Sequence, residues 1–178
     1  MPKWLIVLLL ALSACTPTSI QPTEVTMTLS ITSPAFKNGS PIPAMYTCIS
    51  RDVSPVLAWG GQPSGTKSFA LIMDDPDAPG GTWVHWVIYN IPASARGLPE
   101  ATPIKVQLAD GSLNGVNSWG NSGYGGPCPP SGTHRYFFKL YALDTMLDLP
   151  SGANKQKLLS AMQDHILAQG ELMGTFSK

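Results

Sequence analysis

Three long apolar stretches dominate the sequence, and loops rich in Gly and Pro separate them. The stretches are residues 66–75, 83–91 and 134–143, and they are rich in aromatic and β-branched residues. Runs that are apolar at odd and even positions alike are typical of strands buried on both faces of a sheet. The chain of 178 residues also contains 17 Gly and 17 Pro, too many for a mostly helical protein. These patterns predict a mainly β fold.

Weaker patterns add shorter strands and one helix. The shorter strands are expected at residues 27–31, 56–59 and 172–176. The helix is predicted over residues 154–169, and Gly170 would end it. Its apolar face would consist of Leu158, Leu159, Met162 and Ile166. The sum is a β-sandwich-like domain with a peripheral C-terminal helix.

The first residues resemble the leader of a bacterial lipoprotein. Lys3 precedes eight consecutive apolar residues at 5–12, far fewer than the roughly 20 that a membrane-spanning helix needs. The segment Leu12-Ser-Ala-Cys15 then resembles a lipobox, in which the Cys thiol is lipidated and becomes the new N-terminus. An ordinary secretory signal with an incidental Cys is the alternative.

This leader sets the expected organisation of the chain. Residues 1–14 would be the signal peptide, residues 15–28 the lipidated Cys and a flexible tether, and residues 29–178 the folded domain. The lipid would hold the protein in the bacterial cell envelope, on the periplasmic side of the outer or inner membrane.

Two cysteines remain once Cys15 is set aside. Cys48 and Cys128 would lie in an oxidising compartment if the protein is exported, which favours a disulfide between them. Two buried free thiols are the alternative. The sequence alone leaves both open, because it does not give the separation of the two Cα atoms.

Three side chains with useful chemistry lie where strands meet loops. Asp75 ends one predicted strand, whereas His85 and His134 lie near the start of two others. If these strands are neighbours, the three side chains converge at one end of a sheet, where binding sites are common. The further candidate hydrogen-bond donors are the amides of Gly125 and Gly126 and the hydroxyl of Tyr136.

These groups suit a phosphate-like anion, because imidazoles, glycine amides and a hydroxyl all donate hydrogen bonds. Asp75 would orient or charge a His, or accept a proton from the ligand. No Lys or Arg is evident among these residues, so the affinity is expected to be modest and pH-dependent. The 11 basic and 11 acidic residues of the chain give no basic footprint for nucleic acid.

A metal-dependent hydrolase or other metalloenzyme is the competing hypothesis. Asp75, His85 and His134 together imitate a set of three metal ligands. The sequence lacks a Gly-x-Ser-x-Gly elbow and a His-Glu-x-x-His helix. Phosphate capture explains the glycines and the tyrosine, whereas a metal does not, so binding without catalysis and without a cofactor or metal is favoured.

Three blocks of sequence are similar to the signature segments of the phosphatidylethanolamine-binding protein family, most of all its bacterial Raf-kinase-inhibitor-like branch. The blocks are Asp75-Pro-Asp-Ala-Pro79, Trp83-Val-His-Trp86 and Gly125-Gly-Pro-Cys-Pro-Pro-Ser-Gly-Thr-His-Arg-Tyr136. The resemblance covers about residues 31–176. It implies a β-sandwich of two antiparallel sheets that binds a phosphorylated or other anionic small ligand or headgroup. Modulation of a protein partner, as by a kinase or protease inhibitor, follows only from the family.

Matching these blocks residue by residue implies a ligand pocket. Its residues would be Asp75, Pro79, Trp83, His85, Gly126, Pro130, His134 and Tyr136. Asp77 would shape the Asp-Pro-Asp loop. Residues 115–120 depart from the family, because Gly-Val-Asn-Ser-Trp-Gly replaces the more usual Gly-x-Asn-Asp-Phe-Gly. This segment is expected at the outer rim of the pocket, where it would affect ligand choice.

Overall fold

The computed structural model describes Met1 and residues 27–178. The predicted leader, Cys15 and nearly all of the predicted tether lie outside the described residues. Among the described residues, none of the helices is long and apolar enough to cross a membrane.

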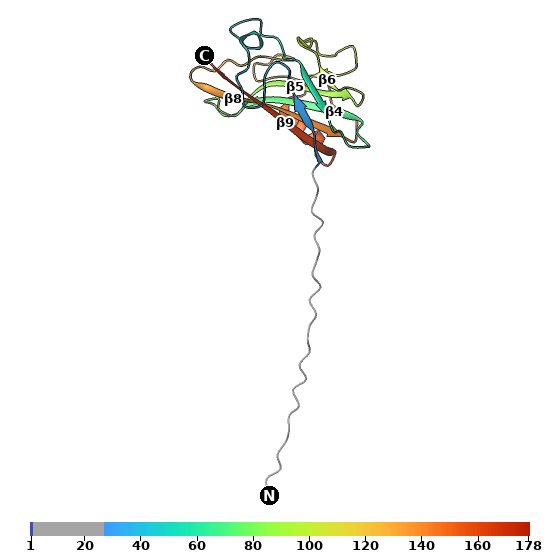
Figure 1. The fold of residues 1–178 in the computed structure, drawn as a ribbon. Helices are drawn as coiled ribbons and strands as arrows, with labels where there is room; N and C mark the ends of the chain where they lie inside the picture. Colours follow the sequence, from blue (N-terminus) through green and yellow to red (C-terminus); the bar gives the residue numbers. More distant parts are fainter. Residues whose placement is uncertain (2–26) are drawn as a thin grey trace.

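Two sheets form the described fold, as predicted. The larger has the strand order β1-β9-β8-β4-β5-β7 and the smaller has the order β2-β3-β6. The larger sheet consists of β1 (Met27–Thr28), β4 (Ser68–Asp75), β5 (Trp83–Pro92), β7 (Leu113–Asn114), β8 (Thr133–Leu143) and β9 (Ile166–Ser177). The smaller sheet consists of β2 (Ser30–Thr32), β3 (Leu57–Gly60) and β6 (Gly97–Leu98). Neighbouring strands are antiparallel except β1 and β9, and Figure 1 shows the long strands side by side.

The main hydrophobic core lies between the two sheets. The large sheet contributes inward-facing residues of β4 and β8, which are Phe69, Leu71, Met73, Tyr136, Phe138 and Leu140. The small sheet contributes Ile31, Trp59 and Leu98. A second cluster lies on the other face of the large sheet under helix α1 (Lys155–Met162), and it includes Ile72, Val87, Tyr89, Leu158 and Met162. Every residue of β4 is buried because both of its faces are covered. This double burial explains why that stretch is apolar at consecutive positions.

The predicted C-terminal helix is wrong in its second half. α1 ends at Met162, and residues 166–177 form β9. β9 pairs with β8 over its whole length, and this ladder outweighs the local helical periodicity. Ile166, which was expected on the buried helical face, is 41% exposed in the strand. Gly170 lies inside β9, where a Cβ would collide with the backbone of Leu29, so this glycine marks a close approach of two backbones.

Candidate functional site

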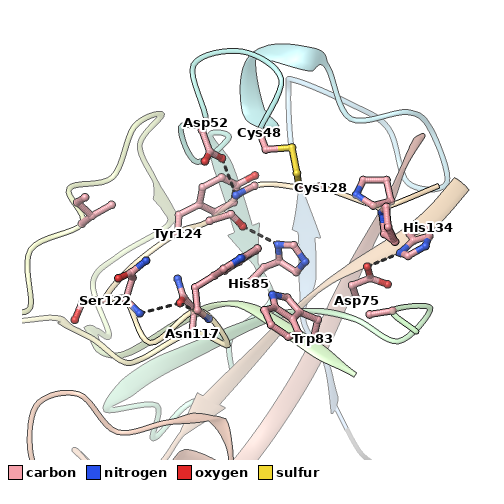
Figure 2. Close-up of a pocket in the computed structure, with 18 of the residues that line it drawn as sticks. Cys48, Asp52, Asp75, Trp83, His85, Asn117, Ser122, Tyr124, Cys128 and His134 are labelled. Atoms are coloured by element: carbon pink, nitrogen blue, oxygen red, sulfur yellow. Dashed lines mark hydrogen bonds and ion pairs between the residues drawn. A yellow bond between two sulfur atoms is a disulfide. The ribbon is translucent and has the colours of Figure 1, made fainter. Parts of the chain in front are cut away.

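A cavity of about 740 Å³ opens at one end of the large sheet. Because the strands are antiparallel, the end of β4 lies beside the beginnings of β5 and β8. Seven of the eight predicted pocket residues line this cavity, and Figure 2 shows four of them around its interior. The seven are Asp75, Pro79, Trp83, His85, Gly126, Pro130 and His134.

Asp75 and His134 form a buried pair in the cavity wall. The Nδ1 atom of His134 lies 2.7 Å from Oδ2 of Asp75, and the side chains are 9% and 5% exposed. The other carboxylate oxygen of Asp75 accepts a hydrogen bond of 2.8 Å from the amide of Asp77. Because an ionised carboxylate only accepts hydrogen bonds, Nδ1 of His134 carries the hydrogen. The Nε2 atom is therefore left for a ligand.

Asp77 and Arg135 brace the turn that carries Asp75. The Arg135 guanidinium donates to both oxygens of Asp77, at 2.6 and 2.9 Å, and the Arg135 amide adds a third bond of 2.9 Å. The side-chain hydrogen bond with Arg135 lowers the pKa of Asp77 to about 2. Arg135 lies on the opposite face of β8 from His134, and it does not line the cavity. Its charge is used to hold the loop.

His85 reaches the cavity because β5 contains a β-bulge. The register between β4 and β5 shifts between Met73 and Asp74, which leaves His85 as the extra residue. Strict alternation along residues 83–91 would place His85 on one face with Val87 and Tyr89, and the structure does not have this arrangement. Those two residues pack in the cluster under α1, whereas His85 lines the cavity. Bulges commonly re-aim a side chain beside a functional site.

The His85 ring is held on three sides. Its Nδ1 lies 2.7 Å from the carbonyl oxygen of Gly125, and because a carbonyl only accepts, Nδ1 donates. The rings of Trp119 and Tyr136 lie edge-on to it, with centroids 5.0 and 5.1 Å away. Burial lowers the pKa of His85 below its usual value. The ring is therefore neutral near pH 7, and Nε2 is a hydrogen-bond acceptor.

Because His85 is buried and neutral, we expect the stability of the fold to decrease in acid. The pKa of an unfolded His is about 6.5, whereas the pKa of folded His85 is lower. Its stabilisation is therefore fully present above about pH 6.5 and is lost as the pH falls toward the folded value. We expect the free energy of unfolding of the ligand-free protein to fall from about pH 7 to about pH 5. Urea denaturation across that range measures this fall, and it should be smaller in His85→Gln; an equal fall in the variant would contradict the assignment.

The amides of Gly125 and Gly126 are not available to a ligand, contrary to the prediction. The Gly125 amide donates to the carbonyl oxygen of His85 at 3.0 Å. The Gly126 amide donates to Oδ1 of Asp52 at 2.7 Å. Gly126 still lines the cavity, but it shapes the wall.

A methyl group at position 126 is expected to displace this wall. A Cβ built on Gly126 would collide with the Asp52 carboxylate, the Tyr46 carbonyl oxygen and Cα of Thr47. Gly126→Ala should therefore destabilise the fold by roughly 1–3 kcal/mol, the usual cost of overpacking. Gly80→Ala is the matched control, because a Cβ at Gly80 meets no atom within 4 Å and Gly80 has no positive φ. Thermal unfolding of both variants measures the difference, and a Gly126→Ala protein as stable as the parent would contradict it.

Tyr136 is the predicted residue that does not line the cavity. It is fully buried behind His85, and its hydroxyl has no hydrogen-bond partner among the described residues. Burial raises the pKa of Tyr136, so its hydroxyl stays protonated as a potential donor. An unpartnered buried hydroxyl beside a cavity is a group that a ligand or water can satisfy.

Several lining residues were missed by the sequence analysis. They include Asp52, Ile104, Asn121, Ser122, Tyr124 and Pro129. Asp52 shows no local signal, because only the fold brings it to Gly126. The segment expected at the rim does contribute Asn117 and Trp119. Trp119 is 44% exposed at the mouth, its ring lies 5.4 Å from that of Trp83, and its amide donates to the Asn117 side chain at 3.0 Å.

The charged groups in the cavity wall are acidic. Asp52 and Asp75 line it, and no Lys or Arg is found among the described residues that do so. Residues 27–178 also contain no cluster of three His, Cys, Asp or Glu side chains arranged to hold a metal ion. The two imidazole rings are therefore the basic side chains of this wall.

Comparisons with known proteins agree with this architecture. Residues 32–177 match the model of a family described as "Phosphatidylethanolamine-binding protein". The UPF0098 protein of Methanothermobacter thermautotrophicus is 53% identical over 144 residues, which cover 81% of this chain and 95% of that protein. The UPF0098 protein of Aquifex aeolicus is 49% identical over 153 residues, which cover 84% and 89%.

Two solved structures are also similar. CT736 from Chlamydia trachomatis, described as a homologue of phosphatidylethanolamine-binding protein, has a TM-score of 0.79 and 40% identity. The match covers 86% of this chain and 99% of CT736. YbcL from E. coli, described as a new member of the mammalian PEBP family, has a TM-score of 0.78 and 34% identity. The match covers 84% of this chain and 98% of YbcL.

Proposed function

Because this chain belongs to the phosphatidylethanolamine-binding protein family, we propose that its cavity binds a phosphorylated or other anionic small ligand or headgroup without converting it. The observation that carries the proposal is the fixed pair of imidazoles. His85 and His134 line one cavity, and each has its Nδ1 atom engaged by the protein. Both Nε2 atoms are left to meet the same ligand.

The size of the cavity supports an organic ligand. Its volume of about 740 Å³ lies within the range of roughly 300–1,000 Å³ that small-molecule sites occupy. The phosphate group would lie between the imidazoles, and the remainder of the ligand would extend past Trp83 and Trp119 at the mouth. The buried hydroxyl of Tyr136 lies behind His85 as a further donor.

Binding of an anion should take up a proton. Neutral His85 presents a lone pair at Nε2, and Asp52 and Asp75 add negative charge to the wall. A phosphate must therefore bring its own proton or meet a protonated imidazole. We expect the affinity for inorganic phosphate to rise as the pH falls from about 8 to about 6. Calorimetry in buffers of different ionisation enthalpy counts the protons. Binding without proton uptake at about pH 8, where free phosphate is mostly dibasic, would contradict this coupling.

A nuclear magnetic resonance titration tests the proposal directly. The chain has three His, so its imidazole signals are few enough to assign. Inorganic phosphate should shift the signals of His85 and His134 and leave that of His165 in place. His165 is the matched control, because it is also paired with a carboxylate, Asp144 at 2.8 Å, but does not line the cavity. Unchanged signals at His85 and His134, or stoichiometric zinc or iron in the purified protein, would overturn the proposal.

Attachment to the cell envelope through Cys15 is a second part of the proposal. The supporting observation is the position of β1 in the large sheet. Met27 of β1 pairs with Ala168 near the start of β9, whereas Phe176 near the end of β9 pairs with His134 beside the cavity. A chain held before β1 would thus be held at the end of the sheet away from the cavity. Labelled lipid should be incorporated into the parent and not into Cys15→Ala, and label that persists would exclude lipidation of this Cys.

A further inference from the structure

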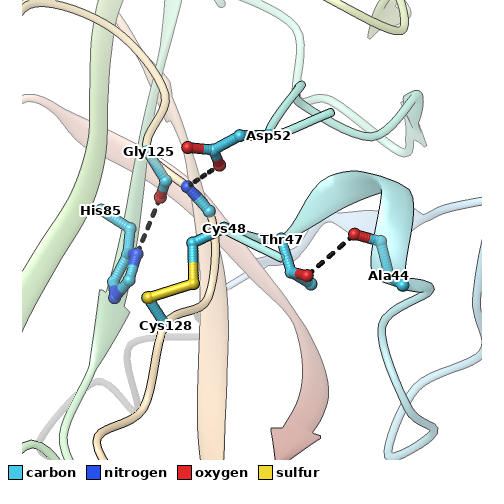
Figure 3. Close-up of a disulfide and its surroundings, with 8 residues drawn as sticks. Ala44, Thr47, Cys48, Asp52, His85, Gly125 and Cys128 are labelled. Carbon is cyan, nitrogen blue, oxygen red and sulfur yellow. Dashed lines mark hydrogen bonds between the residues drawn. A yellow bond between two sulfur atoms is a disulfide. The ribbon is translucent and has the colours of Figure 1, made fainter. Parts of the chain in front are cut away.

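A disulfide joins two loops that form much of one cavity wall. It links Cys48, which follows the short helix η1 (Ala44–Tyr46), to Cys128 in the loop before β8. Figure 3 shows the bridge next to the contacts of Asp52 and Gly125. Both cysteines line the cavity, Cys128 is exposed and Cys48 is half-buried. A reductant in solution can therefore reach the bond.

The first part of the Cys128 loop has other attachments. The Tyr124 hydroxyl donates to the Tyr46 carbonyl oxygen at 2.6 Å. The Gly126 amide donates to Asp52 at 2.7 Å, and the Cys48 amide donates to the Pro127 carbonyl oxygen at 3.1 Å. These three bonds hold the loop as far as residue 127 without help from the disulfide.

The second part of the loop, residues 128–132, lacks such attachments. Within residues 27–178, no backbone–backbone hydrogen bond joins this segment to another part of the chain. Pro129 and Pro130 have no amide hydrogen to donate, and Gly132 has a positive φ of 71°. Cys128, Pro129 and Pro130 nevertheless line the cavity. The disulfide and the packing of the buried Pro129 thus hold this part of the wall.

We propose that the Cys48–Cys128 disulfide is a redox-sensitive clamp that sets the ligand affinity of the cavity. The effect on affinity rests on the proposed function. When the bond is intact, residues 128–130 form a fixed part of the cavity wall, and the ligand meets a preorganised site. When it is reduced, this segment gains conformational freedom that binding must remove again, so affinity falls.

A dithiol such as a Cys-x-x-Cys oxidoreductase supplies the reducing equivalents. One of its thiolates attacks a sulfur of the bridge to form a mixed disulfide, and the other protein sulfur leaves as a thiolate. The second thiol of the reductant then attacks the mixed disulfide and releases the other cysteine. The products are two cysteine thiols and the oxidised reductant, so two electrons and two protons are transferred.

The test compares oxidised and reduced protein in the full chain carrying Cys15→Ser, where the pair supplies the remaining cysteines. Calorimetry with inorganic phosphate should show about tenfold weaker binding after reduction with dithiothreitol. Backbone ¹⁵N relaxation should show larger motion at Ser131 and Gly132 after reduction and unchanged motion at Gly126. The variant Cys48→Ser/Cys128→Ser should match the reduced protein and should not respond to dithiothreitol.

Three outcomes decide the proposal. Equal affinity, together with equal backbone motion at Ser131 and Gly132 in the two redox states, would overturn the clamp. Unfolding of the whole domain on reduction would also overturn it, because the bridge would then support the fold rather than one segment. If oxidised protein does not bind phosphate, the proposed function fails. The backbone motion at Ser131 and Gly132 in the two redox states then still decides whether the bridge fixes the wall.

Discussion

Replacing both Cys48 and Cys128 with serine is expected to lower the free energy of unfolding by about 4 kcal/mol. The bridge joins residues with a sequence separation of 80. A cross-link that closes so long a loop removes much conformational entropy from the unfolded chain, which stabilises the folded state. For a domain of this size the midpoint of thermal unfolding should fall by roughly 10 °C. Equilibrium urea denaturation at 25 °C, with oxidised protein as the reference, measures the change.

The comparison needs a chain without other reactive thiols. Cys15→Ser is the reference background, and the double serine variant is compared with it in the same buffer. The reduced reference protein provides a second estimate without any substitution at the bridge, and it should agree with the variant. A loss below about 1 kcal/mol by both routes would show that the bridge does not restrict the unfolded chain as the entropic model requires.

Truncating His134 to alanine is expected to weaken phosphate binding about 10- to 100-fold, the effect of losing one hydrogen bond to a charged group. The substitution removes the ring whose Nδ1 donates to Asp75, and it leaves that buried carboxylate without its imidazole partner. An anion entering the cavity then loses a positive or donating group and meets an unneutralised negative charge. Calorimetry with inorganic phosphate at slightly acidic pH measures the loss.

His165→Ala is the matched control for this experiment. His165 also pairs with a carboxylate, but its side chain is 45% exposed and it lies outside the cavity. Its removal should leave phosphate affinity unchanged. If His134→Ala folds, as near-ultraviolet circular dichroism would show, and binds phosphate as tightly as the parent, the site is wrongly assigned.

Local sequence patterns were sufficient for the central strands. Residues 68–75, 83–92 and 133–143 are strands close to the predicted bounds. Each is apolar because neighbours cover it, so burial leaves its mark directly on composition. Patterns failed where two periodicities compete. Residues 163–169 look helical locally, yet pairing with β8 makes the last four of them part of a strand.

The candidate site was predictable only in part, for a similar reason. Asp75 and His134 end and begin long strands, so their placement follows from strand bounds and antiparallel order. His85 reaches the cavity through a bulge that no alternation pattern shows. Asp52 reaches it through one hydrogen bond to Gly126, which lies 74 residues away along the chain.

The sequence by itself determined the central strands, the family and seven of the residues that line the cavity. Burial, turn chemistry and signature blocks all depend on residues that are close together along the chain, so a local sequence pattern is enough to recognise them. Only the tertiary structure decided the extent of α1, the aim of His85, the engagement of the glycine amides and the role of Tyr136 behind the wall. Each of those depends on contacts between segments distant along the chain. Such contacts are set by the packing of the whole domain, and the residues that make them show no periodic sequence pattern.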